Sequence, residues 1–204
     1  MKILIALSEM ELPARLTGKL SREGNEVVTA ADAETASRLA ASGQFDAALI
    51  QKDLPGADLS RIVSLLHGKG TPVAVALKGP LGAELLREPE AESYITFPFT
   101  SAEIAGTLAG IVEKASSGRK FDLFGIEIDV AKFTVGGAVR LTNEEIDVLE
   151  AAKDGKEPPS RRLKLYARSL NEKLSRFDRR VRIGKIEGKG YRTMIVHEWE
   201  DYDE

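Results

Sequence analysis

Cysteine is absent from this chain of 204 residues, and histidine occurs only twice, at His67 and His197. Without cysteine there are no disulfides, thiol nucleophiles or iron–sulfur clusters, and two distant histidines leave little for a zinc site. No apolar run approaches the ~18–20 uncharged residues of a membrane-spanning helix. The opening string MKILIALSEMELPARL is too short and too quickly acidic for a secretory signal. We therefore expect a cytoplasmic protein without metal or cofactor and without membrane contact.

Catalytic patterns are also missing. We find no nucleophile–base pair, metal cluster or phosphate-binding loop in the sequence. The string Gly188-Lys189-Gly190 is not a dinucleotide-binding fingerprint, because a predicted strand follows it where that motif requires a helix. The sequence therefore does not predict an enzyme.

The charge of the chain is unevenly distributed. The formal net charge is −3, yet residues 161–192 hold twelve Lys and Arg against three acids. That window has a net charge of +9, so the rest of the chain carries −12. A window this basic in an acidic protein is typical of a surface that binds a polyanion. The alternative is an ordinary solvated face, which accounts for most short charge runs.

Apolar runs and helical periodicities alternate through the first 115 residues. A parallel crossover needs a helix, so five such units predict a doubly wound parallel sheet with helices on both faces over residues 1–115. The fourth helix is the weakest, because Gly82 and Pro89 interrupt it. Thr100 and Glu103 predict a capping box at the start of the fifth helix. The predicted strands cover residues 2–7, 26–30, 47–50, 72–77 and 93–97, and the predicted helices lie near 9–23, 33–42, 58–67, 79–90 and 100–115.

The pattern changes after a short polar linker at residues 116–120. Short antiparallel strands with a Gly136-Gly137 turn come first, and a capping box of Thr142 and Glu145 then opens a helix that runs to about Lys153. A second helix and a β-hairpin follow, and they predict a small α+β domain. We place the second helix at 161–176, the hairpin at 181–196, the domain at 121–197 and an acidic tail at 198–204.

The order of these elements resembles a known regulatory family. Through MKILIAL, EVVTAADAETA, FDAALIQKDLPGADL, TPVAVAL and YITFPF, the first half resembles the receiver domain of two-component response regulators. Through VRLTNEEIDVL, RRLKLYARSLNEKL and IGKIEGKGYR, the second half resembles the winged helix–turn–helix effector of the OmpR/PhoB type. The two resemblances cover nearly the whole chain in the family's usual order. They imply a receiver-type, flavodoxin-like domain followed by a DNA-binding winged helix.

Receivers carry a phosphorylation site at the carboxyl ends of their strands, and the resemblance implies where its positions fall here. An acidic pair for Mg²⁺, a phosphoacceptor aspartate, a hydroxyl and a lysine supply the chemistry. In this chain only the second position of the acidic pair still holds an acid. The phosphoacceptor position holds a glutamine, which cannot form an acyl phosphate. We therefore expect an atypical, orphan response regulator with a degenerate, non-phosphorylatable receiver. The five positions hold Ser8, Glu9, Gln51, Leu77 and Phe97.

Alternatives exist at this edge of the sheet. Asp53 is a substitute phosphoacceptor only if the strand continues past Gln51, and Leu54-Pro55 indicates that it does not. Ser8 also has a structural explanation, because with Glu11 it forms a capping box for the first helix. Open α/β sheets bind ligands at such an edge, so a small-molecule sensor is a further alternative, which the apolar replacements disfavour.

The predicted helix at 161–176 has an apolar seam at helical spacing, formed by Leu163, Ala167, Leu170 and Leu174. The resemblance makes it the recognition helix, a rod of about 22 Å that suits the major groove. We expect Tyr166 to pack in the core. The polar residues outside the seam, expected to face DNA, are Arg161, Arg162, Lys164, Arg168, Ser169, Asn171 and Lys173, with Arg162, Arg168 and Asn171 as candidates for base readout.

The hairpin corresponds to the wing, where Lys185, Lys189 and Arg192 are the expected DNA contacts and Glu187 is an unfavourable charge. A larger departure lies in residues 154–160, DGKEPPS, where the family places a positioning helix and a loop that commonly touches polymerase. Either the recognition helix is held directly by the preceding helix and the sheet, or standard DNA docking is lost.

These observations favour a phosphorylation-independent transcriptional regulator that binds double-stranded DNA. The resemblance implies a homodimer through the fourth helix, fifth strand and fifth helix of the receiver, here about 81–115. The alternative is a protein-interaction adaptor that docks on partners such as RNA polymerase. The short 154–160 segment favours the adaptor, and the basic window favours DNA.

Overall fold

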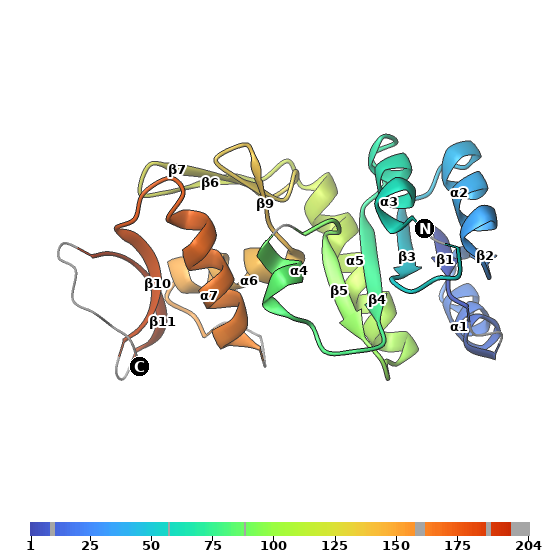
Figure 1. Ribbon diagram of the computed structural model, residues 1–204. Coiled ribbons are helices and arrows are strands. Elements are labelled where there is room, and N and C mark those ends of the chain that lie inside the picture. The colour runs from blue at the N-terminus through green and yellow to red at the C-terminus, as the bar shows by residue number, and fades with distance from the viewer. Residues whose placement is uncertain (9–10, 57, 88, 158–161, 187–188, 197–204) are drawn as a thin grey trace. The chain divides into compact units, whose positions relative to one another are not determined.

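The chain divides into two compact units (Figure 1). One unit comprises Met1–Gly82 and Glu90–Ser117, and the other comprises Ala83–Pro89 and Gly118–Glu204. We had expected residues 83–89 to belong to the first domain, so the chain passes between the units three times where a simple linker would pass once. The computed structural model describes residues 1–8, 11–56, 58–87, 89–157, 162–186 and 189–196.

The first unit is built on a five-stranded sheet in the order β2-β1-β3-β4-β5. Every neighbouring pair is parallel, which confirms the predicted doubly wound α/β class and gives the flavodoxin-like strand order. All residues of β3 and β4 are buried, as expected of strands covered on both faces. The strands are β1 (Lys2–Ala6), β2 (Glu26–Ala30), β3 (Ala47–Gln51), β4 (Val73–Leu77) and β5 (Ser93–Thr96).

Side-chain caps define where several helices of this unit begin. Asp32 accepts a hydrogen bond from the backbone of Thr35 at the start of α2. At the start of α5, Thr100 and Glu103 form the predicted reciprocal capping box. None of the helices in the described part of the chain is long and apolar enough to cross a bilayer. The helices are α1 (Glu11–Arg22), α2 (Ala33–Ser42), α3 (Leu59–His67) and α5 (Ser101–Ser116).

The second unit is smaller and rich in short antiparallel strands. Its four-stranded sheet has the order β6-β7-β8-β9, and Gly136 and Gly137 make the turn between β8 and β9 with φ of 59° and 73°. Thr142 and Glu145 form the second predicted capping box at the start of α6. The elements are β6 (Lys120–Leu123), β7 (Ile126–Asp129), β8 (Thr134–Val135), β9 (Val139–Arg140), α6 (Asn143–Lys153), α7 (Leu163–Leu174), β10 (Val181–Ile186) and β11 (Gly190–Ile195).

The core of the second unit lies between α6, α7 and the β10–β11 hairpin. Ala167, Leu170 and Leu174 are buried as the helical seam predicts, and Tyr166 packs beside them. Val181 and Ile183 point into the same core from alternate positions of β10. Burial raises the pKa of the Tyr166 phenol, because the charged form is disfavoured away from water.

A short helix, α4 (Ala83–Arg87), completes this unit from a distant part of the sequence. It spans five residues of the expected 79–90 region. Its main contact is with α7, and Leu86 is fully buried. α4 therefore belongs to the core around α7.

Candidate functional site

The carboxyl ends of β1 and β3 are joined by a pair of polar side chains. Gln51 is the last residue of β3 and is fully buried. Its Oε1 atom accepts hydrogen bonds from the Ser8 backbone N at 3.1 Å and from the Ser8 hydroxyl at 3.0 Å. The Gln51 Nε2 atom has no hydrogen-bond partner among the described residues. The residue at the position that the resemblance assigns to the phosphoacceptor is thus an amide that accepts two hydrogen bonds from Ser8.

The Ser8 hydroxyl donates to Gln51, a contact that the sequence did not predict. The expected capping of the first helix by Ser8 involves residues 9–10, which lie outside the described residues, so it stays a prediction.

Apolar side chains occupy the two positions that the resemblance assigns to the hydroxyl and the lysine of a receiver. Leu77, the last residue of β4, is 3% exposed, and the half-buried Phe97 has its ring 4.2 Å from that of Phe99. Glu9, the remaining position, lies outside the described residues. These hydrocarbon groups offer nothing to phosphoryl oxygens, which require cations and hydrogen-bond donors.

Asp53 does not join this group. β3 ends at Gln51, and Asp53 is an exposed residue of the following turn. The strand alternation that would bring its carboxylate to the same side as Gln51 therefore stops before reaching it.

In the second unit, α7 and the hairpin carry several exposed cations. Arg162, Lys164 and Arg168 are exposed on α7, as expected, and Arg168 Nε lies 3.4 Å from Glu172 Oε1. Lys185 and Lys189 are exposed on the hairpin. Arg161, also expected here, lies outside the described residues.

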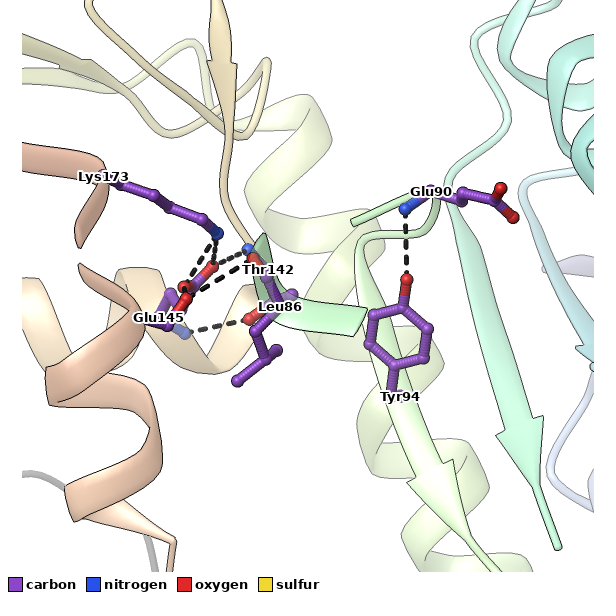
Figure 2. A network of polar contacts seen from close by, with 7 residues as sticks. Leu86, Glu90, Tyr94, Thr142, Glu145 and Lys173 are labelled. Carbon is purple, nitrogen blue, oxygen red and sulfur yellow. Dashed lines mark hydrogen bonds and ion pairs between the residues drawn. The ribbon is translucent and has the colours of Figure 1, made fainter. Parts of the chain in front are cut away.

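Two predicted DNA contacts, Ser169 and Lys173, are buried, so that expectation is wrong. The Lys173 Nζ atom lies 2.6 and 2.8 Å from the two carboxylate oxygens of Glu145 (Figure 2), with 1% and 0% of the two side chains exposed. The Ser169 hydroxyl donates to the same carboxylate at 2.7 Å. Burial lowers the pKa of the Lys173 ammonium, and the adjacent Glu145 carboxylate opposes that shift.

The sequence carried a signal for this burial. Tyr166, Ser169, Leu170, Lys173 and Leu174 follow the i, i+3, i+4, i+7, i+8 spacing of a wide buried helix face. The sequence prediction counted only the apolar residues of this face. It therefore made the buried face too narrow and placed Ser169 and Lys173 on the exposed side of the helix.

Asn171 is also unsuited to the expected base readout. Its Nδ2 donates to the carbonyl of Ile183 at 2.9 Å, and its Oδ1 accepts from the N–H of the same residue at 2.7 Å. Both ends of the amide are occupied in joining α7 to β10. The half-buried Arg192 similarly directs its guanidinium to the Tyr191 carbonyl at 2.6 Å.

A groove of about 700 Å³ lies between α7 and the hairpin. Lys164 and Arg168 line it from α7, and Arg182 and Lys185 line it from β10, with Glu172 as the one acid among the described residues of the lining. The sequence reasoning missed Arg182, although the alternation of buried Val181 and Ile183 would have placed it on the outer face of the hairpin. It also missed Tyr191, which lines the groove from β11.

Comparison with known proteins gives several relatives. No family model matches the chain. The response regulator ArlR of Staphylococcus aureus is 26% identical over 216 residues, covering 93% of this chain and 98% of ArlR. The transcriptional regulatory protein TcrA of Mycobacterium tuberculosis is 26% identical over 159 residues. That alignment covers 74% of this chain and 63% of TcrA, which is less than two thirds of its length.

Solved structures share the fold. A mutant of RitR superposes with a TM-score of 0.58 at 20% identity, covering 95% of this chain and 99% of that one. The receiver domain of the Francisella response regulator 1452 gives 0.51 at 18% identity, covering 56% of this chain and 98% of its own. The chain therefore has the response-regulator fold, with a receiver-type unit and a smaller β-rich unit, and its sequence relatives are regulators.

Proposed function

We propose that the chain is a transcriptional regulator that binds double-stranded DNA through α7 and the β10–β11 hairpin. The observation that carries this proposal is the basic groove between these elements. In the described part of the chain, four cations from two elements line this groove together with a single carboxylate. A phosphate backbone supplies the matching charge, and contacts to it provide most of the affinity of such proteins.

The geometry of α7 suits this function. Its twelve residues form a rod of about 18 Å, which the major groove of B-DNA accommodates. Lys164 and Arg168 lie one turn apart on the exposed side, so both face the same ligand. Arg168 pairs with a guanine edge in this arrangement, while Lys185 and Arg182 contact phosphates.

We further propose that this regulator acts without phosphorylation. Gln51 cannot form an acyl phosphate, and its carbonyl oxygen is already engaged by Ser8. Leu77 and Phe97 take the places of the hydroxyl and ammonium that receivers use on phosphoryl oxygens. The receiver-type unit then has a structural role, and we propose that it pairs two copies through β5 and α5. We leave α4 out of this proposed surface because it packs on α7.

Selection from a random duplex library tests the DNA proposal, because it reports binding, specificity and half-site symmetry together. We expect enrichment of a symmetric site. The double variant Arg162→Ala/Arg168→Ala should abolish the specific shift of that site in a gel. The matched control Lys19→Ala/Arg22→Ala removes two exposed cations from α1 and should leave the shift intact.

Two outcomes would overturn the proposal. A wild-type protein that ignores duplexes at low ionic strength leaves the adaptor as the better function. Binding of random DNA as tightly as of any selected fragment removes the regulator interpretation.

A further inference from the structure

α7 receives less support from its neighbours in sequence than the resemblance implies. α6 ends at Lys153 and α7 begins at Leu163, and no described residue between them is helical. The DGKEPPS string in this stretch holds two prolines, which disfavour a helix. Nevertheless six residues of α7 are buried on a face wider than a single seam. Another element must cover part of that face.

α4 is that element. Its Leu86 side chain is 0% exposed although the helix has only five residues. The Ser169 hydroxyl of α7 lies 3.4 Å from the Leu86 carbonyl oxygen, and Arg87 Nε lies 3.7 Å from Glu172 Oε2. One side chain and one backbone group of α4 therefore meet α7 one turn apart.

The contact at Ser169 brings α4 to the buried ion pair. The same hydroxyl donates to Glu145 Oε1 at 2.7 Å, and that oxygen also accepts from Lys173 at 2.8 Å. Figure 2 shows Leu86 at this network together with Thr142 of the capping box. The two side chains of this ion pair are 1% and 0% exposed, so the network lies inside the core of the second unit. Leu86 is the side chain through which α4 joins that core, because it is fully buried.

We propose that α4 is the positioning helix of the DNA-reading unit, and that Leu86 and Ser169 are the residues through which it fixes α7. The inference rests on the proposed function for its effect on DNA, but the support of α7 is measurable without DNA. Because residues on both sides of α4 continue into the receiver-type unit, the orientation of the recognition helix depends on a segment that the second half of the sequence does not encode.

Amide hydrogen exchange of the full-length protein tests this proposal. Leu86→Ala removes the anchor and should speed exchange of the α7 amides by at least about tenfold, with β1, β3 and β4 unchanged. Leu85→Ala makes the same truncation at the neighbouring, partly exposed position and should stay within ~threefold of wild type. Leu86→Met, which keeps the volume, should restore slow exchange.

The DNA readout separates this proposal from the previous one. Leu86→Ala should lower the affinity for the selected duplex by about tenfold although no charge is lost. Arg162→Ala/Arg168→Ala should also lower this affinity, but it should leave the hydrogen exchange of α7 unchanged. If wild type binds no DNA, the exchange comparison still decides the role of α4. Unchanged α7 exchange in Leu86→Ala overturns the proposal. If that variant unfolds throughout, Leu86→Val is read by the same criterion.

Discussion

Replacement of Lys173 by methionine tests whether the second unit depends on its buried ion pair. Methionine keeps the length of the side chain and removes the charge, so the Glu145 carboxylate stays buried with 0% exposure and without its cation. Lys173 supplies two hydrogen bonds to that carboxylate, at 2.6 and 2.8 Å, and the neutral donors Ser169 and the Thr142 backbone N–H, which also reach it, carry no compensating charge. An uncompensated buried charge of this kind costs about 3–5 kcal/mol.

The magnitude is large against the total stability of a domain, which is typically about 5–15 kcal/mol. Urea unfolding followed by circular dichroism measures the loss, and hydrogen exchange of α6 and α7 locates it in the second unit. Lys156→Met is the matched control: Lys156 pairs with Asp154 at 3.1 Å with 73% and 48% of the two side chains exposed, and its loss should cost under about 1 kcal/mol.

A double variant tests whether the stability lost in Lys173→Met comes from the unpaired charge of Glu145. Lys173→Met/Glu145→Gln leaves a neutral amide in place of the carboxylate, so it should recover part of the stability lost in Lys173→Met. A cost below about 1 kcal/mol for Lys173→Met, equal to that of the exposed control, would refute the reasoning.

Three further predictions follow from the same structure. Incubation with acetyl phosphate or a beryllofluoride mimic should leave the protein unmodified in mass spectrometry and NMR, and a modified Asp53 would contradict this. Affinity for the selected duplex should fall steeply with salt, and a flat titration would show that phosphates are not contacted. The hydrogen bond from Arg180 lowers the pKa of the Asp178 carboxyl below its ordinary value of 3.8. The ionised carboxylate therefore stabilises the folded protein above pH 3.8, and this stabilisation is lost as the pH falls through the lowered pKa. The variant Asp178→Asn should therefore show a weaker loss of stability on acidification in parallel urea titrations.

The sheet was predictable because its signals are local. Strands buried on both faces read as continuous apolar runs, and the expected strand at 26–30 coincides with β2 while the expected helix at 33–42 coincides with α2. Both predicted capping boxes at Thr100 and Thr142 also formed, since a cap depends on residues only three positions apart.

The errors share a different origin, which is contact between distant residues. Ser169 and Lys173 are polar, so a sequence pattern turns them outward, and only Glu145, more than twenty positions away, makes their burial favourable. α4 is too short to be stable by itself and gains its place from α7, which lies about eighty residues along the chain. No local pattern in residues 79–90 contains that information.

The structure also changes what the basic window means. Of its twelve cations, Lys173 is buried in an ion pair with Glu145, which lies outside the window, so the formal charge of +9 overstates the charge that meets a ligand. Among the described residues, the groove lining has four cations and one acid, a net charge of +3. Three neutralised phosphates per copy give a log–log salt slope of about −3 for a monomer, and six give about −5 for a dimer. The slope measured on a symmetric site therefore distinguishes one copy on the DNA from two. A slope of about −8 for one copy or about −16 for two, as the full window would suggest at about −0.9 per charge, would show that the groove is not the surface that binds.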